Sequence, residues 1–149
     1  HAGPILILVG AGGVFGNVLK KTPLADLVQQ WVNNGSFSPI TFLLIAYAIG
    51  SLLKTAQGST TSAIIVATSI LAPIATIAGF IQPLSLSLLL SATAAGAMMV
   101  SHTNDAYFWV ISQFSGLSMQ ETYRSFSLLS IVLSITSLLV ILLLALVAL

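Results

Sequence analysis

The chain has 149 residues; 57% of them are hydrophobic, 5% are charged, and the formal net charge is +1. Soluble domains carry about 25% charged residues, so this composition excludes an ordinary soluble domain and indicates an integral membrane protein. The sequence has no basic patch for nucleic acid, and without cysteine it forms neither a disulfide frame nor a thiolate metal site. No linker or change of composition divides the chain, so we expect residues 1–149 to form one membrane portion with no soluble domain.

The first recognisable pattern is a glycine-rich segment at residues 10–16. Gly10, Gly12 and Gly13 are candidates for a backbone binding site, because glycines let a helix unwind and expose its amides. Alternatively, Gly12 and Gly16 form a GxxxG pair that allows close helix packing. Both interpretations stay open.

Two apolar runs, residues 40–53 and 63–81, flank a polar stretch at residues 54–62. Read as one helix, residues 39–81 would be about 64 Å long, whereas the hydrocarbon core of a bilayer is about 30 Å thick. We therefore predict a helical hairpin that turns back near Gln57-Gly58-Ser59. Irregular backbone at membrane depth is tolerated only where protein buries it or a wet cavity solvates it, so we expect a re-entrant hairpin whose tip lies inside the protein.

A second polar stretch, residues 101–105, separates an apolar helix predicted over residues 84–100 from an apolar-aromatic helix predicted over residues 106–114. Together the two are too long for one straight span, so we predict a discontinuous helix. Further along, Ser118 and Glu121 have the spacing of a capping box. They predict the start of a final helix that becomes an apolar membrane span.

The polar stretch at the hairpin tip offers groups for an anionic ligand. The helix that begins there presents unpaired amides and the positive end of its dipole, as at the broken helices of secondary transporters. We expect substrate to be bound by Gln57, Gly58, Ser59, Thr60 and Thr61. The alternative is that Thr60, Thr61 or Ser62 only caps the helix, and both can hold. Lys54 is either a counter-charge for the substrate or a side chain that snorkels to the interface.

In the second polar stretch, Asp105 is the most informative residue, because an ionisable group at membrane depth is costly and is a functional-site hypothesis by default. We expect it either to cap the following helix, a role that Asn104 can also fill, or to carry a proton or bind a cation. Histidine is the side chain whose charge ordinarily changes near neutral pH, so His102 is a candidate to share the proton. Ser101 and Asn104 are expected to contact the substrate.

The adjacency of Ser101, His102 and Asp105 does not indicate a protease, because a catalytic triad is defined by its geometry in space and the pattern G-x-S-x-G is absent from the sequence. A metal site is not expected either, since His102 is the only internal histidine. We therefore expect no enzyme activity and no cofactor beyond a coupling ion.

Taken together, these motifs resemble the gluconate permease family of bacterial proton-coupled sugar-acid symporters. The motifs that match are the glycine segment 10–16, the tip 56–61, the stretch 101–105 with Phe108-Trp109, and the turn at 116–122. The resemblance implies the C-terminal part of a longer all-α carrier with inverted repeats and re-entrant hairpins, in the lipid bilayer of the bacterial cytoplasmic (inner) membrane. It also implies a multi-pass chain, an N-terminal half of the same transporter as partner, and a homo-oligomer.

Two positions depart from the pattern of that family. Lys54 stands where members often have arginine, which removes a bidentate fork for a carboxylate. Ala106-Tyr107 replaces a small residue followed by glycine, which adds bulk beside the site. Both departures leave gluconate itself open and keep the class of small hydroxylated carboxylates as the expected substrate.

We therefore predict a proton-coupled symporter of gluconate-like sugar acids or other small hydroxylated organic carboxylates, with Asp105 and His102 handling the proton. Sodium coupling in the same fold is the close rival, because hydroxyl, amide and carbonyl oxygens at broken helices suit Na⁺. Two alternatives come from other classes of protein. One is a non-transporting membrane subunit whose breaks are only packing kinks, and the other is an intramembrane hydrolase.

Overall fold

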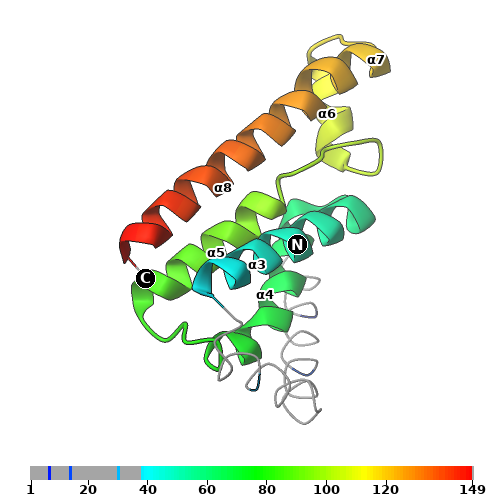
Figure 1. Cartoon of the computed structure of the whole chain (residues 1–149). Helices are drawn as coiled ribbons and strands as arrows, with labels where there is room; N and C mark the ends of the chain where they lie inside the picture. The colour runs from blue at the N-terminus through cyan, green and yellow to red at the C-terminus, as the bar shows by residue number, and fades with distance from the viewer. Residues whose placement is uncertain (1–6, 8–13, 15–29, 31–37, 149) are drawn as a thin grey trace.

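The computed structural model describes residues 38–148 together with Ile7, Val14 and Gln30. The elements between residues 38 and 148 are α3 (Pro39–Gln57), α4 (Thr60–Ala75), α5 (Pro83–Gly96), α6 (Ala106–Phe114), α7 (Met119–Thr122), the π-helical turn η1 (Tyr123–Ser127) and α8 (Leu128–Ala148). No strand occurs within residues 38–148, so the all-α prediction is confirmed for this part of the chain. Figure 1 shows α8 running along α5, with α3 and α4 on the other side of α5.

The first two of these helices form a hairpin with a two-residue turn. α3 ends at Gln57 and its C-cap is Gly58, whose φ of 72° lies in the left-handed region that favours glycine; the Gly58 N–H donates to the Lys54 carbonyl at 2.8 Å. Ser59 then caps α4 by accepting a hydrogen bond from the Ser62 N–H at 3.3 Å. The two helices pack against each other, so the predicted turn near residues 57–59 is confirmed.

α5 packs closely against α3 because glycines face the partner's backbone. A Cβ atom at Gly50 would lie 2.4 Å from the Thr93 carbonyl oxygen, and one at Gly96 would lie 2.0 Å from the Tyr47 carbonyl oxygen. Small residues at a helix crossing are typical of membrane helices. The buried apolar cluster around these helices consists of Phe42, Leu43, Ala46, Leu71, Ala75, Phe80, Leu88, Leu89, Ala92, Ala95, Ile141 and Ala145.

The break between α5 and α6 is longer than the sequence predicts. The first half was expected to reach residue 100, but α5 ends at Gly96. The Met99 N–H donates to the Gly96 carbonyl at 2.9 Å, which is the tighter bond of a terminal turn. After this turn the backbone N–H and carbonyl of Ser101 bond to Ser130 and Ser127, which lie near the start of α8, and α5 does not continue. The second half, α6, occupies Ala106–Phe114 as predicted.

α7, η1 and α8 form one continuous helix, Met119–Ala148. Its start is the predicted capping box: the Ser118 N–H donates to Glu121 Oε2 at 2.8 Å, and the Glu121 N–H donates to Ser118 Oγ at 3.3 Å. The sequence does not predict the π-helical turn. Among the described helices, this one and α3 are the two that are long and apolar enough to cross a membrane.

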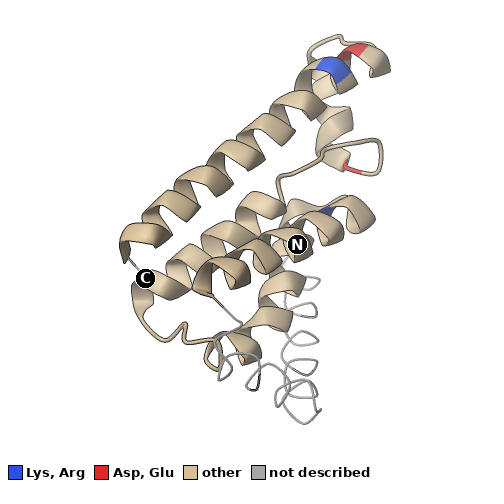
Figure 2. Ribbon diagram, viewed as in Figure 1, with Lys and Arg blue, Asp and Glu red and all other residues tan. Residues whose placement is uncertain are grey.

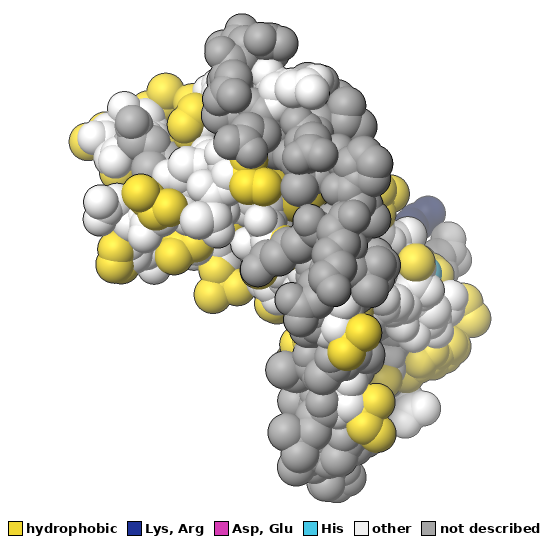
Figure 3. Space-filling model, turned by 90° about the horizontal axis from the view of Figure 1, so that it is seen from below, with side chains coloured by type: hydrophobic (Ala, Val, Ile, Leu, Met, Phe, Trp, Pro, Cys, Tyr) yellow, Lys and Arg dark blue, Asp and Glu magenta, His cyan; other side chains and the backbone are white. Residues whose placement is uncertain are grey.

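The described surface exposes many large apolar side chains, which suits a lipid environment. Exposed apolar side chains occur along the whole of α8, namely Leu128, Leu129, Val132, Leu133, Ile135, Leu139, Val140, Leu143, Leu144, Leu146 and Val147. The view from below also shows apolar side chains on the described part of that face (Figure 3). The charged residues of the described part lie toward the end of the molecule that holds α6 and α7 (Figure 2).

Candidate functional site

The two polar breaks, which lie far apart in the sequence, meet in space. A Cβ atom at Gly58 would lie only 2.2 Å from the Asn104 carbonyl oxygen, so the hairpin tip contacts the backbone of the second break. The Asn104 amide Nδ2 donates to the Thr55 carbonyl at 2.8 Å, and His102 Nε2 lies 3.2 Å from the same oxygen. A carbonyl only accepts, so this contact requires the proton on Nε2 of His102. The second break therefore holds the C-terminal end of α3.

A buried ion pair joins the same two regions. Lys54 Nζ, in the last turn of α3, lies 2.6 Å from Asp105 Oδ2, and the two residues are only 2% and 5% exposed. Lys54 Nζ also donates to the Gly58 carbonyl at 3.3 Å. The Ser101 hydroxyl donates to Asp105 Oδ2, and the Tyr107 N–H donates to Oδ1 at 3.0 Å. A buried pair needs such additional hydrogen bonds to offset the loss of water, and here the pair has them.

These contacts show which structural roles the residues of the two breaks have. Asp105 is the N-cap of α6, and it is also the partner of a lysine. Lys54 does not snorkel to an interface, since it is almost fully buried. At the hairpin tip, the cap is Ser59, so the expectation of a cap at Thr60, Thr61 or Ser62 is wrong. The reason is that Gly58 is the C-cap of α3. Ser59, the next residue, is therefore outside α3 and has the extended conformation of an N-cap.

A cleft of about 610 Å³ opens between the hairpin tip and the start of α6. Its lining residues are Gln57, Gly58, Ser59, Thr60, Thr61, Asn104, Asp105, Ala106, Tyr107 and Val110. The lining includes the first turns of both α4 and α6. First-turn amides have no acceptor within their own helix, and the helix dipole places positive charge there. Two helix N-termini on one cleft are a suitable environment for an anionic group.

Two predicted substrate contacts, Lys54 and Ser101, line a neighbouring pocket instead of this cleft. That pocket has a volume of about 410 Å³. It is mainly apolar, and its lining consists of Lys54, Thr60, Met98, Ser101, Asp105, Tyr107, Phe126, Leu129, Ser130 and Leu133. Thr60, Asp105 and Tyr107 belong to both linings. The ion pair therefore lies between a polar cleft and an apolar pocket.

Two further predictions concern other positions. His102 contacts the Thr55 carbonyl, and within residues 38–148 no hydrogen bond joins its ring to Asp105. The predicted backbone site at Gly10, Gly12 and Gly13 lies outside the described residues.

Sequence reasoning missed a set of serines on the C-terminal helix. Ser127 and Ser134 are buried, and the hydroxyls of Ser127, Ser130 and Ser134 bond to the backbone at or after the end of α5. A signal was present in the sequence. The three serines recur at helical spacing within an otherwise apolar run, and such spacing places them on one face of a helix.

α6 is anchored to the same helix by aromatic contacts. Phe108 is fully buried, and its ring centroid lies 4.9 Å from that of Tyr123. Tyr107 packs edge-on against Phe126 with the centroids 5.6 Å apart. The Trp109 indole N–H donates to the Thr103 carbonyl at 2.8 Å. These contacts fix the direction in which α6 points its first turn.

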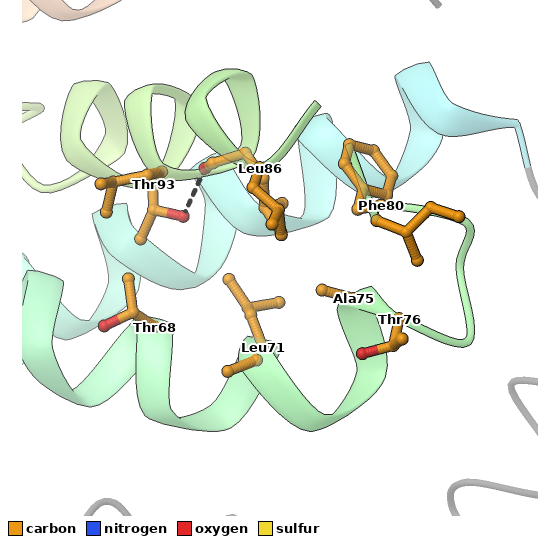
Figure 4. A pocket seen from close by; sticks show the side chains of 11 residues that line it. Thr68, Leu71, Ala75, Thr76, Phe80, Leu86 and Thr93 are labelled. Atoms are coloured by element: carbon orange, nitrogen blue, oxygen red, sulfur yellow. Dashed lines mark hydrogen bonds between the residues drawn. The ribbon is translucent and has the colours of Figure 1, made fainter. Parts of the chain in front are cut away.

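A third hollow, between α4 and α5, does not resemble a site for a polar ligand. It has a volume of about 360 Å³ and is lined mostly by apolar side chains, among them Leu71, Ala75, Phe80 and Leu86 (Figure 4). The Thr68 and Thr93 hydroxyls donate to carbonyls of their own helices, at 2.7 Å and 2.8 Å. No charged residue belongs to the lining.

The family model for GntP family permeases matches residues 1–147. The chain is 34% identical over 143 residues to the gluconate permease of Pseudomonas aeruginosa, covering 96% of this chain and 30% of that protein. It is 33% identical over 134 residues to the high-affinity gluconate transporter of Escherichia coli K12, covering 90% of this chain and 29% of that protein.

A third relative is named for a different substrate. The chain is 31% identical over 134 residues to the D-serine transporter DsdX of Escherichia coli K12, covering 90% of this chain and 29% of that protein. The chain thus spans 29–30% of the length of these three relatives. No solved structure matches it. The relatives are permeases and transporters, so the expectation that the chain is not an enzyme is confirmed.

Proposed function

The chain belongs to the GntP permease family, and from that premise we propose that it is the C-terminal, substrate-binding part of a longer carrier for small hydroxylated carboxylates. Gluconate and D-serine, the substrates in the names of its relatives, both have a carboxylate and a hydroxyl group. We place the carrier in the bacterial cytoplasmic membrane as a multi-pass protein, with the α3–α4 hairpin as a re-entrant element.

The observation that carries this proposal is the convergence of two helix N-termini on one cleft. The first turn of α4 offers the amides of Thr60 and Thr61, and α6 begins at the same cleft with Ala106. A substrate carboxylate would accept hydrogen bonds from these amides. Gln57, Ser59 and Asn104 would bind the substrate hydroxyl groups. The carboxylate of Asp105 does not oppose an anion there, because Lys54 balances its charge.

The lengths of the helices support a site at membrane depth. α4 has 16 residues and α5 has 14, so they are about 24 Å and 21 Å long. The hydrocarbon core is about 30 Å thick. Helices of this length end inside it, which is how broken helices supply their termini to a substrate site in secondary transporters.

We propose that Asp105 carries the coupling proton. When Asp105 is protonated, its carboxyl group is neutral and the Lys54 ammonium is left to balance the charge of a bound substrate carboxylate. When the proton leaves, the Lys54–Asp105 pair forms again and the substrate loses its counter-charge. His102 has a secondary role in this scheme, because its bond to the Thr55 carbonyl ties the second break to the hairpin tip.

Uptake by the full-length permease in proteoliposomes tests the proposal. We expect radiolabelled gluconate or D-serine to accumulate under an inward proton gradient in sodium-free buffer. The Asp105→Asn variant should lose this accumulation and keep substrate exchange across the membrane at equal pH. Glu121→Gln is the matched control, because Glu121 is also acidic but lies in the exposed capping box.

Three results would contradict the proposal in different ways. Uptake that needs a sodium gradient would replace the proton by Na⁺ as the coupling ion. Unchanged proton-driven accumulation by Asp105→Asn would remove Asp105 from the coupling step. A wild-type protein that takes up neither compound would overturn the substrate class.

A further inference from the structure

We infer that Ser127 and Ser130 are positioning residues for the Lys54–Asp105 pair, and that they act through Ser101. The inference rests on the proposed function, since it assigns residues of the C-terminal helix to the same transport step. Neither serine lines the polar cleft.

The backbone of Ser101 is held from both sides by these two serines. The Ser101 N–H donates to Ser130 Oγ at 3.3 Å, and the Ser127 hydroxyl donates to the Ser101 carbonyl. The Ser130 hydroxyl in turn donates to the Ser127 carbonyl at 2.8 Å. Both backbone groups of Ser101 thus have their partners on the C-terminal helix, at a point where α5 has already ended.

The fixed backbone directs the Ser101 side chain. Its hydroxyl donates to Asp105 Oδ2, the same oxygen that lies 2.6 Å from Lys54 Nζ. Ser101, Lys54 and Asp105 are all buried. A continuous path of hydrogen bonds therefore runs from Ser127 through Ser101 to the ion pair.

The π-helical turn allows one helix to hold both ends of this break. Tyr123, the first residue of η1, packs against Phe108 of α6 and donates from its hydroxyl to Thr103 Oγ1 at 3.3 Å. Ser127, the last residue of the same turn, bonds to Ser101. A π-helical turn inserts an extra residue and so changes which side chains face inward; such turns are frequent at functional sites.

A serine that bonds to a buried backbone group can stabilise the fold without positioning the ion pair. The test therefore needs a control serine that makes such a bond away from Ser101. Ser134 provides it. Ser134 is fully buried, lies on the same helix, and donates to the Ala95 carbonyl at 2.6 Å. Ala95 belongs to α5 and precedes the break. Ser134→Ala removes this bond and the contacts of the same hydroxyl with Tyr47 Oη and Met99 Sδ, none of which involves Ser101.

The experiment is a double-mutant cycle on uptake by the full-length permease in proteoliposomes, with radiolabelled gluconate and D-serine. We expect Ser127→Ala and Ser101→Ala each to raise the KM for proton-driven uptake about fivefold to tenfold, the effect of one lost hydrogen bond. Both should move the pH profile of uptake in the same direction, because both change the surroundings of Asp105. The Ser101/Ser127 double variant should be no worse than the worse single variant.

The controls separate positioning from folding. Ser134→Ala should leave the pH profile of uptake unchanged. In the Ser101/Ser134 double variant, the rise in KM should be the product of the two single-variant rises. Ser127→Thr, which keeps the hydroxyl, should restore uptake. If Ser127→Ala does not reach the membrane, the same experiment is done with Ser127→Cys. A thiol fills a similar space but is only a weak hydrogen-bond donor.

Failure of the inference is distinguishable from failure of the proposed function. The inference alone is overturned if the wild-type protein transports but the KM of the double variant rises by the product of the two single-variant effects. It is also overturned if the wild-type protein transports and Ser127→Ala leaves the pH profile of uptake unchanged. A wild-type protein that takes up neither compound overturns the proposed function and the inference with it.

Discussion

The hairpin tip and the second break are both interruptions between helices, yet they are stabilised in different ways. The tip is stabilised by its own neighbours in sequence: the Gly58 N–H bonds to the Lys54 carbonyl, and Ser59 accepts from the Ser62 N–H. The second break depends on distant residues, because Ser127 holds Ser101 and Lys54 holds Asp105. A turn closed by local bonds is specified by its own sequence. A break held by distant partners forms only when the helices have packed.

The largest effect is expected from removing one half of the ion pair. Lys54→Met leaves the Asp105 carboxylate buried without its charged partner, which costs about 3–5 kcal/mol of stability. The Lys54→Met/Asp105→Asn double variant removes both charges and should recover most of that loss. Thermal unfolding of the purified full-length permease in detergent measures both. A double variant no more stable than Lys54→Met would mean that the loss does not come from an unpaired Asp105 carboxylate.

A smaller effect is expected at the contact between the two regions. Gly58→Ala places a Cβ against the Asn104 carbonyl at a positive φ, and we expect a loss of about 1–3 kcal/mol together with loss of substrate binding. Gly116→Ala is the matched control, because Gly116 has a φ of 65° but no atom within 4 Å of its added Cβ. Equal losses of stability and binding in the two variants would show that only the backbone strain matters.

The smallest effect on stability is expected at the caps that are local to the sequence. Ser59→Ala and Ser118→Ala each remove an N-cap side chain, at a cost of about 1 kcal/mol. Only Ser59 lines the polar cleft, so only Ser59→Ala should weaken binding of gluconate or D-serine, as measured by equilibrium binding to the full-length permease. Weaker binding in Ser118→Ala of the same size would argue against a substrate site at the hairpin tip.

The resemblance of its motifs identified the family from the sequence alone, and the family model confirms it over residues 1–147. Two breaks at polar stretches were also predictable, because a length argument forces the chain to turn within an apolar run. The sequence also led us to expect that residues of both breaks contact the same substrate, but not that the two breaks contact each other directly. The atoms that make the contact, such as the Asn104 carbonyl beside Gly58, were not predictable.

The sequence by itself determined the turns and caps, in which the bonding groups lie within a few residues of each other. The turn after α3, the start of α6 at Ala106 and the capping box at Ser118 are of this kind. Tertiary structure alone decided that Lys54 pairs with Asp105, that α5 ends at Gly96, and that the serines of the C-terminal helix bond to the second break. The physical reason is that a buried polar group must find a partner, but its own sequence does not say which distant group packing will bring beside it.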